Sequence, residues 1–374
     1  MREILLILSF ACYISCTSDI DMIDLSNVDK VRTRVTANDV YASVDFVPLE
    51  TTEECILCNP SVFAVDDSSV FIWDGDDVYR FSTEGKYCNR VGRFGHGYSE
   101  HGRLNSANYD RKRKVILLGT PDGTIYKYGY DGTFIDKIKL TFGNELLQTV
   151  RWSDSLDCMV CEIREYSKRG LKVWLSLVSQ VGKKLNSYEI YSDEDNFDLD
   201  MLKTGMLRNS GNGVYFKLPF SDSLYYLSST GISIPLILYQ GASSPDRRDV
   251  EDMDYRKKGK KVTQQINNMV ITNNYIYLSI DKGYQSYDVI IRKDSHTIIH
   301  CSEVENNVYR HLDIRGMKSV TFWPWIADSG VCVDIIPTDD FCIEDIKAIG
   351  CDTSNLVGTE LERNPILVIA HESQ

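Results

Sequence analysis

Four polar side chains lie close together in a glycine-rich segment and could contact a ligand. Arg93, His96, Glu100 and His101 all fall within residues 92–101. Gly95-His96-Gly97 begins like a dinucleotide-binding fingerprint, but the third glycine, a following helix and a suitably spaced acid are missing. We therefore interpret the segment as a connection between repeated units. Because binding residues often lie on loops held by a rigid scaffold, the four are candidate ligand contacts, and the alternative is that they are solvated loop residues.

Two Cys-x-x-Cys pairs could in principle hold zinc or act as redox groups. They are Cys55/Cys58 and Cys158/Cys161, which lie far apart in the sequence. The second pair sits in an apolar, strand-like run, where residues i and i+3 point to opposite faces. A tetrahedral zinc site needs paired ligands on a turn. We therefore favour buried small hydrophobic residues or incidental disulfides over zinc or redox chemistry, and we expect no metal and no cofactor.

The spacing of acids, serines and histidines does not define a catalytic group. Asp66 and Asp110 recur after strand-like runs, which suits a turn residue as well as a metal ligand. The histidines do not repeat with any period, and neither a Ser-His-Asp arrangement nor a pair of catalytic carboxylates can be assigned from spacing. Whether the protein is an enzyme stays open, and binding without catalysis is favoured.

The charge balance argues against nucleic acid as a partner. The chain of 374 residues has a net charge of −13, which opposes binding to a phosphate backbone. The basic stretch 256–261 follows several acids and reads as a solvated insertion. No apolar run reaches the roughly 18 residues of a transmembrane helix.

The N-terminus has the pattern of an export signal. Arg2 precedes an apolar run, Ile4 to Ile14, and Tyr13-Ile14-Ser15-Cys16 resembles the lipobox of bacterial lipoproteins. This predicts a signal segment over 1–16, acylation of Cys16 and a polar tether over 17–38. The protein would then be exported and held at the outer membrane through its lipid only, facing the periplasm or the exterior. An ordinary cleaved signal or a buried N-terminal strand are the alternatives.

The rest of the chain consists of short apolar runs separated by turn residues. Val115-Ile116-Leu117-Leu118 and Tyr275-Ile276-Tyr277-Leu278 are examples. Such runs are apolar on both faces, so each strand should be covered from two sides. This pattern indicates stacked sheets.

A hairpin turn recurs with a nearly constant period. Gly85, Gly132, Gly182 and Gly231 follow one another at spacings of 47, 50 and 49 residues, and each would supply a positive φ. A four-stranded unit of this length is a propeller blade. Blades are expected at 56–92, 104–141, 147–191, 203–239 and 264–304, with a sixth from about 313 to the end that includes a capped helix at 338–349. A fifth turn, Lys293-Asp294-Ser295, has lost its glycine.

These stretches resemble the six-bladed β-propeller lipoproteins of Bacteroidetes, which are related to NHL-repeat propellers. The likeness is carried by Val44-Asp45-Phe46-Val47-Pro48-Leu49-Glu50-Thr51-Thr52, by the loop 92–100, by Tyr255-Arg256-Lys257-Lys258-Gly259-Lys260 and by Asn364-Pro365-Ile366-Leu367-Val368-Ile369-Ala370. In the loop, Tyr98 and Ser99 replace the family's Pro-Gly. The family motifs are structural and none is catalytic.

Together these observations predict an all-β, six-bladed β-propeller domain over 39–374. Its blades have four antiparallel strands, and the strand at 40–49 closes the last blade. We expect a non-catalytic binding module whose channel mouth or rim loops engage a protein or a glycan. The alternative is a metal-dependent hydrolase or lyase that uses the central channel.

Overall fold

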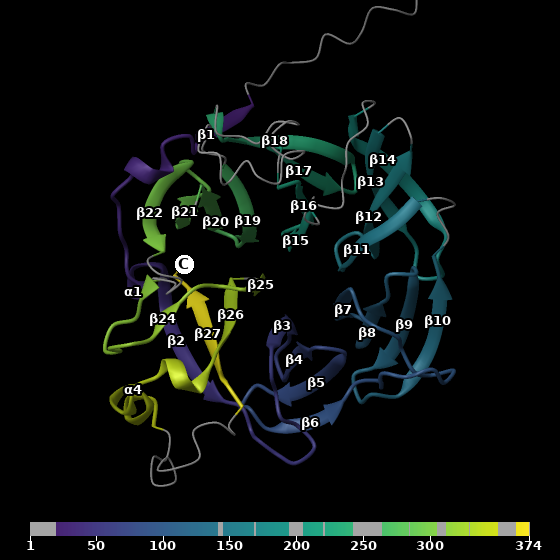
Figure 1. Cartoon of the computed structure of the whole chain (residues 1–374), viewed down its shortest axis with the longest axis horizontal. Coiled ribbons are helices and arrows are strands. Elements are labelled where there is room, and N and C mark those ends of the chain that lie inside the picture. Colours follow the sequence, from purple (N-terminus) through teal and green to yellow (C-terminus); the bar gives the residue numbers. More distant parts are fainter. Residues whose placement is uncertain are drawn as a thin grey trace, which may run out of the picture.

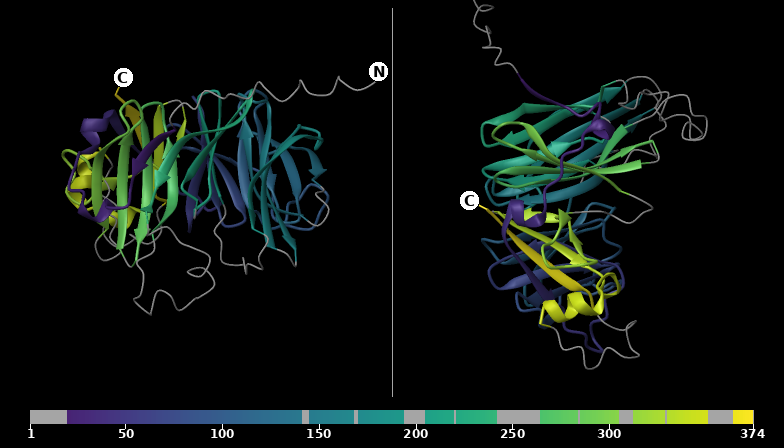
Figure 2. Two further views of the ribbon diagram at one scale, coloured as in Figure 1. Left: turned by 90° about the horizontal axis from the view of Figure 1, so that it is seen from above. Right: turned by 90° about the vertical axis from the view of Figure 1, so that its left-hand side faces the viewer.

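The computed structural model describes residues 20–140, 145–167, 170–193, 205–219, 221–241, 264–283, 285–304, 312–328, 330–350 and 364–373. Its strands form six blades arranged around a central axis, as Figure 1 shows. Seen from the side, most strands run from one face of the ring to the other (Figure 2). The predicted all-β, six-bladed propeller is therefore confirmed.

Blades 1 to 3 are antiparallel sheets in which the strands follow chain order. Blade 1 contains β3 (Pro60–Val65), β4 (Ser69–Asp74), β5 (Asp77–Ser82) and β6 (Tyr87–Arg90). Blade 2 contains β7 (Ser106–Asp110), β8 (Val115–Gly119), β9 (Thr124–Gly129) and β10 (Phe134–Lys139). Blade 3 contains β11 (Glu145–Ser153), β12 (Cys158–Ser167), β13 (Gly170–Val178) and β14 (Lys184–Asp193).

Blades 4 and 5 repeat this plan. Blade 4 contains β15 (Met206–Ser210), β16 (Gly213–Lys217), β17 (Ser223–Ser228) and β18 (Gly231–Tyr239). Blade 5 contains β19 (Gln264–Ile271), β20 (Tyr275–Lys282), β21 (Gln285–Arg292) and β22 (Thr297–Val304). The innermost strands of neighbouring blades contact one another, which places β3, β7, β11, β15 and β19 around the axis.

Blade 6 joins the two ends of the described chain. It contains β25 (Ile326–Asp328), β26 (Val331–Ile336), β27 (Ile366–Glu372) and, outermost, β2 (Tyr41–Pro48). β2 pairs with β27 from Tyr41 opposite Glu372 to Pro48 opposite Ile366. The prediction that the N-terminal strand closes the last blade is confirmed, and it leaves β27 without an open edge.

The N-terminal segment before β2 packs against the ring. It includes β1 (Asp21–Asp24), the 3₁₀ turn η1 (Val28–Lys30) and α1 (Ala37–Val40). β1 adds to β18 as a parallel fifth strand of blade 4, and Ile23, Leu25 and Val28 are buried. These apolar side chains give residues 20–38, which the polar composition suggested as a tether, enough buried area to dock on blades 4 and 5. Residues 1–19 lie outside the described part.

The hydrophobic core is divided among the interfaces between blades. One cluster joins blades 1 and 2 through Phe71 and Tyr109, and another joins blades 2 and 3 through Leu117 and Met159. Four more join the remaining neighbours around the ring in the described part of the chain. Strands covered on both sides in this way explain the doubly apolar runs in the sequence.

The repeated turns have the expected backbone. Gly85, Gly132, Gly182 and Gly231 have φ values of 83°, 88°, 81° and 125°. In the fifth turn, where the glycine is missing, His296 takes the positive φ at 53°. A β-carbon on Gly85 would lie 2.2 Å from the carbonyl oxygen of Pro48, so this glycine is also required by close packing.

Blade 6 differs from its prediction in two details. Its inner strand begins at Ile326, and residues near 313 form a separate two-stranded sheet of β23 (Leu312–Asp313) and β24 (Thr321–Phe322). The expected helix at 338–349 is a 3₁₀ turn, η3 (Thr338–Asp340), followed by α4 (Ile343–Ala348). Phe341 is buried with extended φ and ψ angles, and this break prevents one continuous helix.

Candidate functional site

The glycine-rich loop between β6 and β7 is closed by its own hydrogen bonds. The His101 amide donates to the Arg93 carbonyl at 2.9 Å, and the Gly95 amide donates to the His101 carbonyl at 3.0 Å. The Glu100 carboxylate accepts from the Gly97 amide at 2.8 Å. A β-carbon on Gly95 would lie 2.1 Å from a Glu100 carboxylate oxygen. The glycines therefore serve to fold this loop around Glu100.

The four candidate residues of this loop do not converge on a pocket. His101 is fully buried against the rings of Tyr126 and Tyr128, and burial lowers its pKa. Arg93 and His96 are exposed, and Glu100 is partly exposed. Their role in ligand binding stays a prediction, and Cys16 lies outside the described residues.

The cysteine pairs have different environments. Cys158 and Cys161 are both buried in β12, and burial raises the pKa of Cys158 to about 11. Metal binding and redox exchange need a thiolate, which this burial disfavours. Cys55 is buried and Cys58 is exposed. Within the described ranges, no three His, Cys, Asp or Glu side chains come together so that they could hold a metal ion.

A cavity of about 440 Å³ opens where the inner strands end near the axis. We call it the channel mouth. Five blades contribute to its lining, through Arg111 and Lys112, Ser153 to Ser155, Asn209 to Gly211, Ile271 to Asn273, and Ala327 and Asp328. Hydroxyl, amide and charged groups dominate this lining. Its volume lies in the range of small-molecule sites, which is roughly 300–1,000 Å³.

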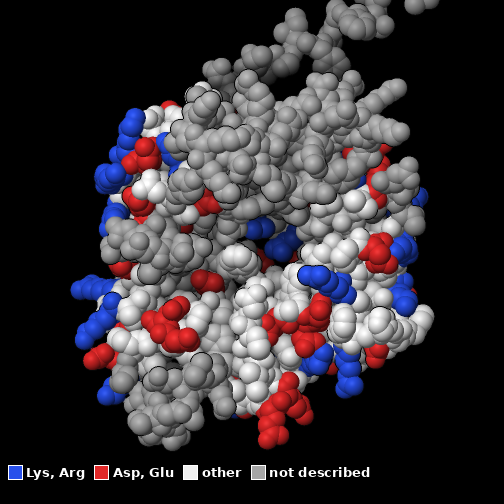
Figure 3. All heavy atoms as spheres, in the orientation of Figure 1, with Lys and Arg blue, Asp and Glu red and all other residues white. Residues whose placement is uncertain are grey.

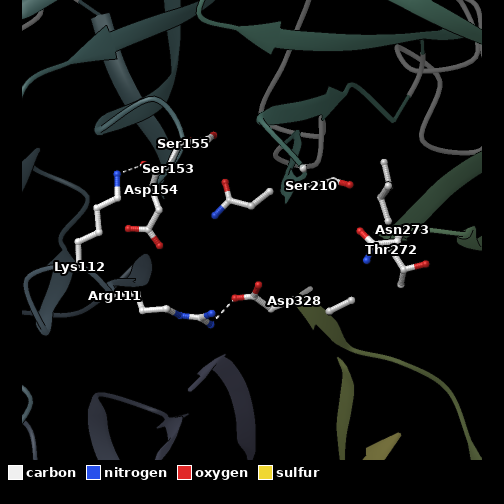
Figure 4. Close-up of a pocket in the computed structure, with 13 residues that line it drawn as sticks. Arg111, Lys112, Ser153, Asp154, Ser155, Ser210, Thr272, Asn273 and Asp328 are labelled. Carbon is white, nitrogen blue, oxygen red and sulfur yellow. Dashed lines mark hydrogen bonds and ion pairs between the residues drawn. The ribbon is translucent and has the colours of Figure 1, made fainter. Parts of the chain in front are cut away.

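Two contacts between blades shape the mouth (Figure 4). The Arg111 guanidinium donates to the Asp328 carboxylate at 2.5 Å, which joins blade 2 to blade 6. Lys112 donates from Nζ to the Asp154 carbonyl at 2.7 Å, which joins blade 2 to blade 3. Arg111 also donates to the Val65 carbonyl of blade 1 at 2.7 Å. These bonds fix the turns that surround the cavity.

A smaller cavity of about 50 Å³ shares part of the lining of the mouth. Asn108, Arg151 and Ile326 are among its lining residues, together with Arg111, Asp154 and Asp328. Figure 3 shows a hollow near the centre of the molecule with Lys or Arg atoms at its wall. The channel thus carries positive charge although the whole chain is acidic.

Amide side chains connect the inner strands across blade boundaries. Asn108 of β7 donates to the Val150 carbonyl at 2.8 Å and accepts from the Trp152 amide at 3.2 Å. Asn209 of β15 donates to the Trp152 carbonyl at 2.8 Å. β11 is therefore held from both sides, which fixes the position of Arg151 between Val150 and Trp152.

The inner-strand arginines are electrostatically coupled. Burial lowers the pKa of Arg208 to about 9, and the neighbouring charge of Arg151 acts in the same direction. Burial also lowers the pKa of Arg151, and Asp328 opposes this effect. Both guanidiniums remain cationic at neutral pH, since arginine keeps its proton in proteins.

The acids suggested by the sequence are engaged within the protein. Asp66 accepts from the Tyr109 hydroxyl at 2.7 Å, and Asp110 is paired with Arg113 at 2.9 Å. Sequence reasoning missed Arg151 as a residue that lines the channel, and Arg208 as its neighbour on the next inner strand. Their signal was an arginine two positions before the end of an inner strand in successive blades, which becomes visible only once the ends of β11 and β15 are known.

In the described part of the chain, no helix is long and apolar enough to cross a membrane. None of the curated proteins matches this chain. A crystal structure of a protein from Bacteroides fragilis NCTC 9343, whose name assigns it to export, superimposes with a TM-score of 0.70 at 16% identity. That match covers 94% of this chain and 100% of the other.

Two further solved structures have lower TM-scores. A protein of unknown function from Bacteroides caccae has a TM-score of 0.37 at 10% identity, over 78% of this chain and 82% of the other. The structure of U3-55K has a TM-score of 0.45 at 10% identity, over 87% of this chain and 98% of the other.

The family comparison covers almost the whole described chain. The model of a domain of unknown function, DUF4934, matches residues 20–371, from β1 to the end of blade 6. The resemblance to lipoproteins and to NHL repeats stays a prediction beside this match. The chain is thus a six-bladed β-propeller that belongs to the DUF4934 family.

Proposed function

We propose that this protein is an exported, non-catalytic binding module whose channel mouth binds a glycan. The observation that carries the proposal is the lining of the mouth, in which hydroxyl and amide groups from blades 3, 4 and 5 surround a cavity of about 440 Å³. Such groups suit a ligand rich in hydroxyls, because each can donate and accept hydrogen bonds. A protein partner would be expected to need aromatic anchors in a desolvated patch.

The geometry favours the mouth over the rim loops as the binding place. The mouth is built on the ends of strands that are bonded to their neighbours, whereas Arg93 and His96 stand apart on a loop. Sites supported by rigid elements position their ligands better than isolated loop residues do. Trp325 is 50% exposed but does not line the mouth, so it does not belong to this site.

Blocking the mouth tests the proposal. The probes are neutral and acidic oligosaccharides presented on an array, followed by calorimetry with those that bind the mature protein. Ser155→Trp should fill the cavity from its exposed edge and abolish binding. Ser233→Trp, at an exposed position on the outer strand β18, is the matched control and should bind as the unmodified protein does. Equal binding by both variants would overturn the assignment of the mouth, and protein ligands captured without any glycan would favour the protein alternative.

The same samples test the enzymatic alternative. Incubation of a bound oligosaccharide should leave it unchanged. Shortened or unsaturated products that disappear with a chelator would instead favour the metal-dependent hydrolase or lyase.

We infer that export ends with a lipid on Cys16 and anchoring at the outer membrane. The lipobox-like sequence supports this, and the similar protein of Bacteroides fragilis is named for export. Cys16→Ala should move the protein from the membrane fraction to the soluble fraction. Unchanged fractionation would contradict the anchor.

A further inference from the structure

Three arginines lie on or directly after the inner strands that surround the channel. Arg111 follows β7 at the mouth, Arg151 lies in β11, and Arg208 lies in β15. Arg111 and Arg151 line the same small cavity. Arg208 is close enough to Arg151 for the two charges to repel each other.

Arg111 and Arg208 are satisfied by the protein. Arg111 bonds the Asp328 carboxylate and the Val65 carbonyl. Arg208 donates to the Met269 carbonyl at 2.5 Å, to the Asn268 side chain at 2.8 Å and to its neighbour's carbonyl at 2.9 Å. Through these hydrogen bonds, both side chains join neighbouring blades.

Arg151 has no such contacts. Among the described residues, its guanidinium has no hydrogen-bond acceptor and interacts with Asp328 only at longer range. It is half-buried, so solvent still reaches it. A guanidinium carries five donors in a planar fork, and at Arg151 these donors are left for solvent or for a ligand.

The position of Arg151 is nevertheless fixed. The side chains of Asn108 and Asn209 bond the backbone of Val150 and Trp152 on either side of it. The strand therefore presents the arginine from a rigid backbone, and a ligand would only have to orient its side chain. Preorganisation of this kind lowers the cost of binding.

The lining of the two cavities has a net positive charge, although the complete chain is acidic. The cationic residues that line the two cavities are Arg111, Lys112 and Arg151, and the acidic ones are Asp154 and Asp328. The whole chain, in contrast, carries a net charge of −13. Asp154 accepts from the Trp152 indole at 2.9 Å, and Asp328 is engaged by Arg111. Among the described residues, neither Lys112 nor Arg151 is paired with a carboxylate, and of the two only Arg151 also lacks a hydrogen-bond acceptor.

We propose that Arg151 binds an oxyanion, a carboxylate or a sulfate, carried by the glycan in the mouth. This rests on the proposed function and names its ligand class as acidic oligosaccharides. The sugar ring would contact the hydroxyls and amides of the mouth, and its acidic group would extend toward β11. The planar fork of arginine can hold either oxyanion through two parallel hydrogen bonds.

Calorimetry of the mature protein with matched probes tests the inference. The first pair of probes is oligogalacturonate, which carries carboxylates, and its methyl ester, which does not. The second pair is a sulfated galactan oligosaccharide and its desulfated form. The acidic member of at least one pair should bind about tenfold to hundredfold more tightly than its neutral partner, as a charged hydrogen-bonded pair implies. Which pair discriminates identifies the oxyanion.

Arg151→Gln should remove this preference, because it should weaken binding of the acidic probes far more than binding of their neutral partners. Arg315→Gln, at an exposed arginine away from the channel, is the matched control and should keep the preference. Thermal unfolding gives an independent readout of folding: because the described residues offer the Arg151 guanidinium no acceptor, Arg151→Gln should unfold at the same or a higher temperature. An unchanged preference for acidic probes in folded Arg151→Gln would overturn the inference.

The two proposals fail in different ways. Loss of neutral-glycan binding in Ser155→Trp, together with equal affinity for acidic and neutral probes, would keep the glycan site and refute the oxyanion site. Acetate and sulfate ions test whether Arg151 binds an anion even when no glycan binds. If they shift the Arg151 side-chain resonance in NMR spectra and no oligosaccharide binds, the glycan function and the acidic-glycan inference both fail, and only an ion site remains.

Discussion

At the scale of single residues, Arg151 and Asp334 are two charged side chains that receive little compensation from the described part of the chain. Arg151 faces the channel, where a ligand can reach it. Asp334 in β26 is half-buried, and its carboxylate accepts one hydrogen bond, from the Ile335 amide at 2.8 Å. It shares a strand face with Cys332 and Ile336, which belong to the cluster between blades 5 and 6. We propose a role in binding for the first charge, whereas we expect the second to lower stability.

Asp334→Asn should therefore stabilise the protein in a pH-dependent way. Burial raises the pKa of Asp334 to about 7, above its unfolded value near 3.9. The unfolded chain then holds fewer protons than the folded one between these values, so stability falls as pH rises from about 4 to about 7. Relative to the unmodified protein, the gain in the free energy of unfolding should grow over that interval and level off above it, at roughly 1–3 kcal/mol.

Denaturant unfolding at several pH values measures this difference. Asp313→Asn, at an exposed position, serves as control and should give no such trend. A gain for Asp334→Asn that is the same at pH 4 and pH 8 would contradict the burial of this carboxylate.

At the scale of elements, the hairpin turns and the inner strands differ in how well the sequence predicts them. The turns follow local rules, since Gly85, Gly132 and Gly182 all supply the positive φ that their pattern suggests. The fifth turn uses His296 at a φ of 53° instead. A side chain in this region is strained by about 1 kcal/mol relative to glycine.

His296→Gly should relieve this strain and raise the free energy of unfolding by up to about 1 kcal/mol. The measurement is best made at high ionic strength, because salt screens the exposed 3.7 Å contact of His296 with Asp21. Ser295→Gly, one position earlier in the same turn, should destabilise instead. A loss of stability in His296→Gly would show that the contacts of the His296 side chain stabilise the protein by more than the strain of its positive φ destabilises it.

The channel site could not be predicted in the same way. Strand periodicity and turn spacing locate each blade, because both depend on neighbours in the sequence. The mouth instead brings together residues as distant as Arg111 and Asp328, which meet only when the ring closes. The sequence suggests ligand contacts in the loop at 92–101 because the polar residues of that loop are close together in sequence. Its glycines are explained by the fold of the loop around Glu100.

At the scale of the whole molecule, the ring depends on one strand from the other end of the chain. β2 covers β27 over its full length, and Phe46 packs edge-on against Phe341 at a centroid distance of 6.0 Å. Without β2, blade 6 would keep three strands and expose an open edge. The segment 20–38, which precedes β2, docks on blades 4 and 5 and adds further contacts between the N-terminal part of the described chain and the ring.

A disulfide across this closure should form in the observed register. Ser43 lies opposite His371, so the double variant Ser43→Cys/His371→Cys should crosslink and raise the free energy of unfolding by about 2–4 kcal/mol. Reduction should remove the gain. The diagonal pair Asp45→Cys/His371→Cys, whose two positions are not opposite each other, should remain reduced. Crosslinking of the diagonal pair alone would mean that β2 closes the ring in another register.

The central claim is that the channel mouth binds an acidic glycan with its charged group at Arg151. The most direct measurement is a crystal structure of the mature protein grown with the acidic oligosaccharide that binds best in solution. We expect density for sugar rings among the hydroxyl and amide groups of the mouth, with the oxyanion within hydrogen-bond distance of the Arg151 guanidinium. A ligand bound at the loop 92–101 or on an outer strand, with the mouth empty, would contradict it.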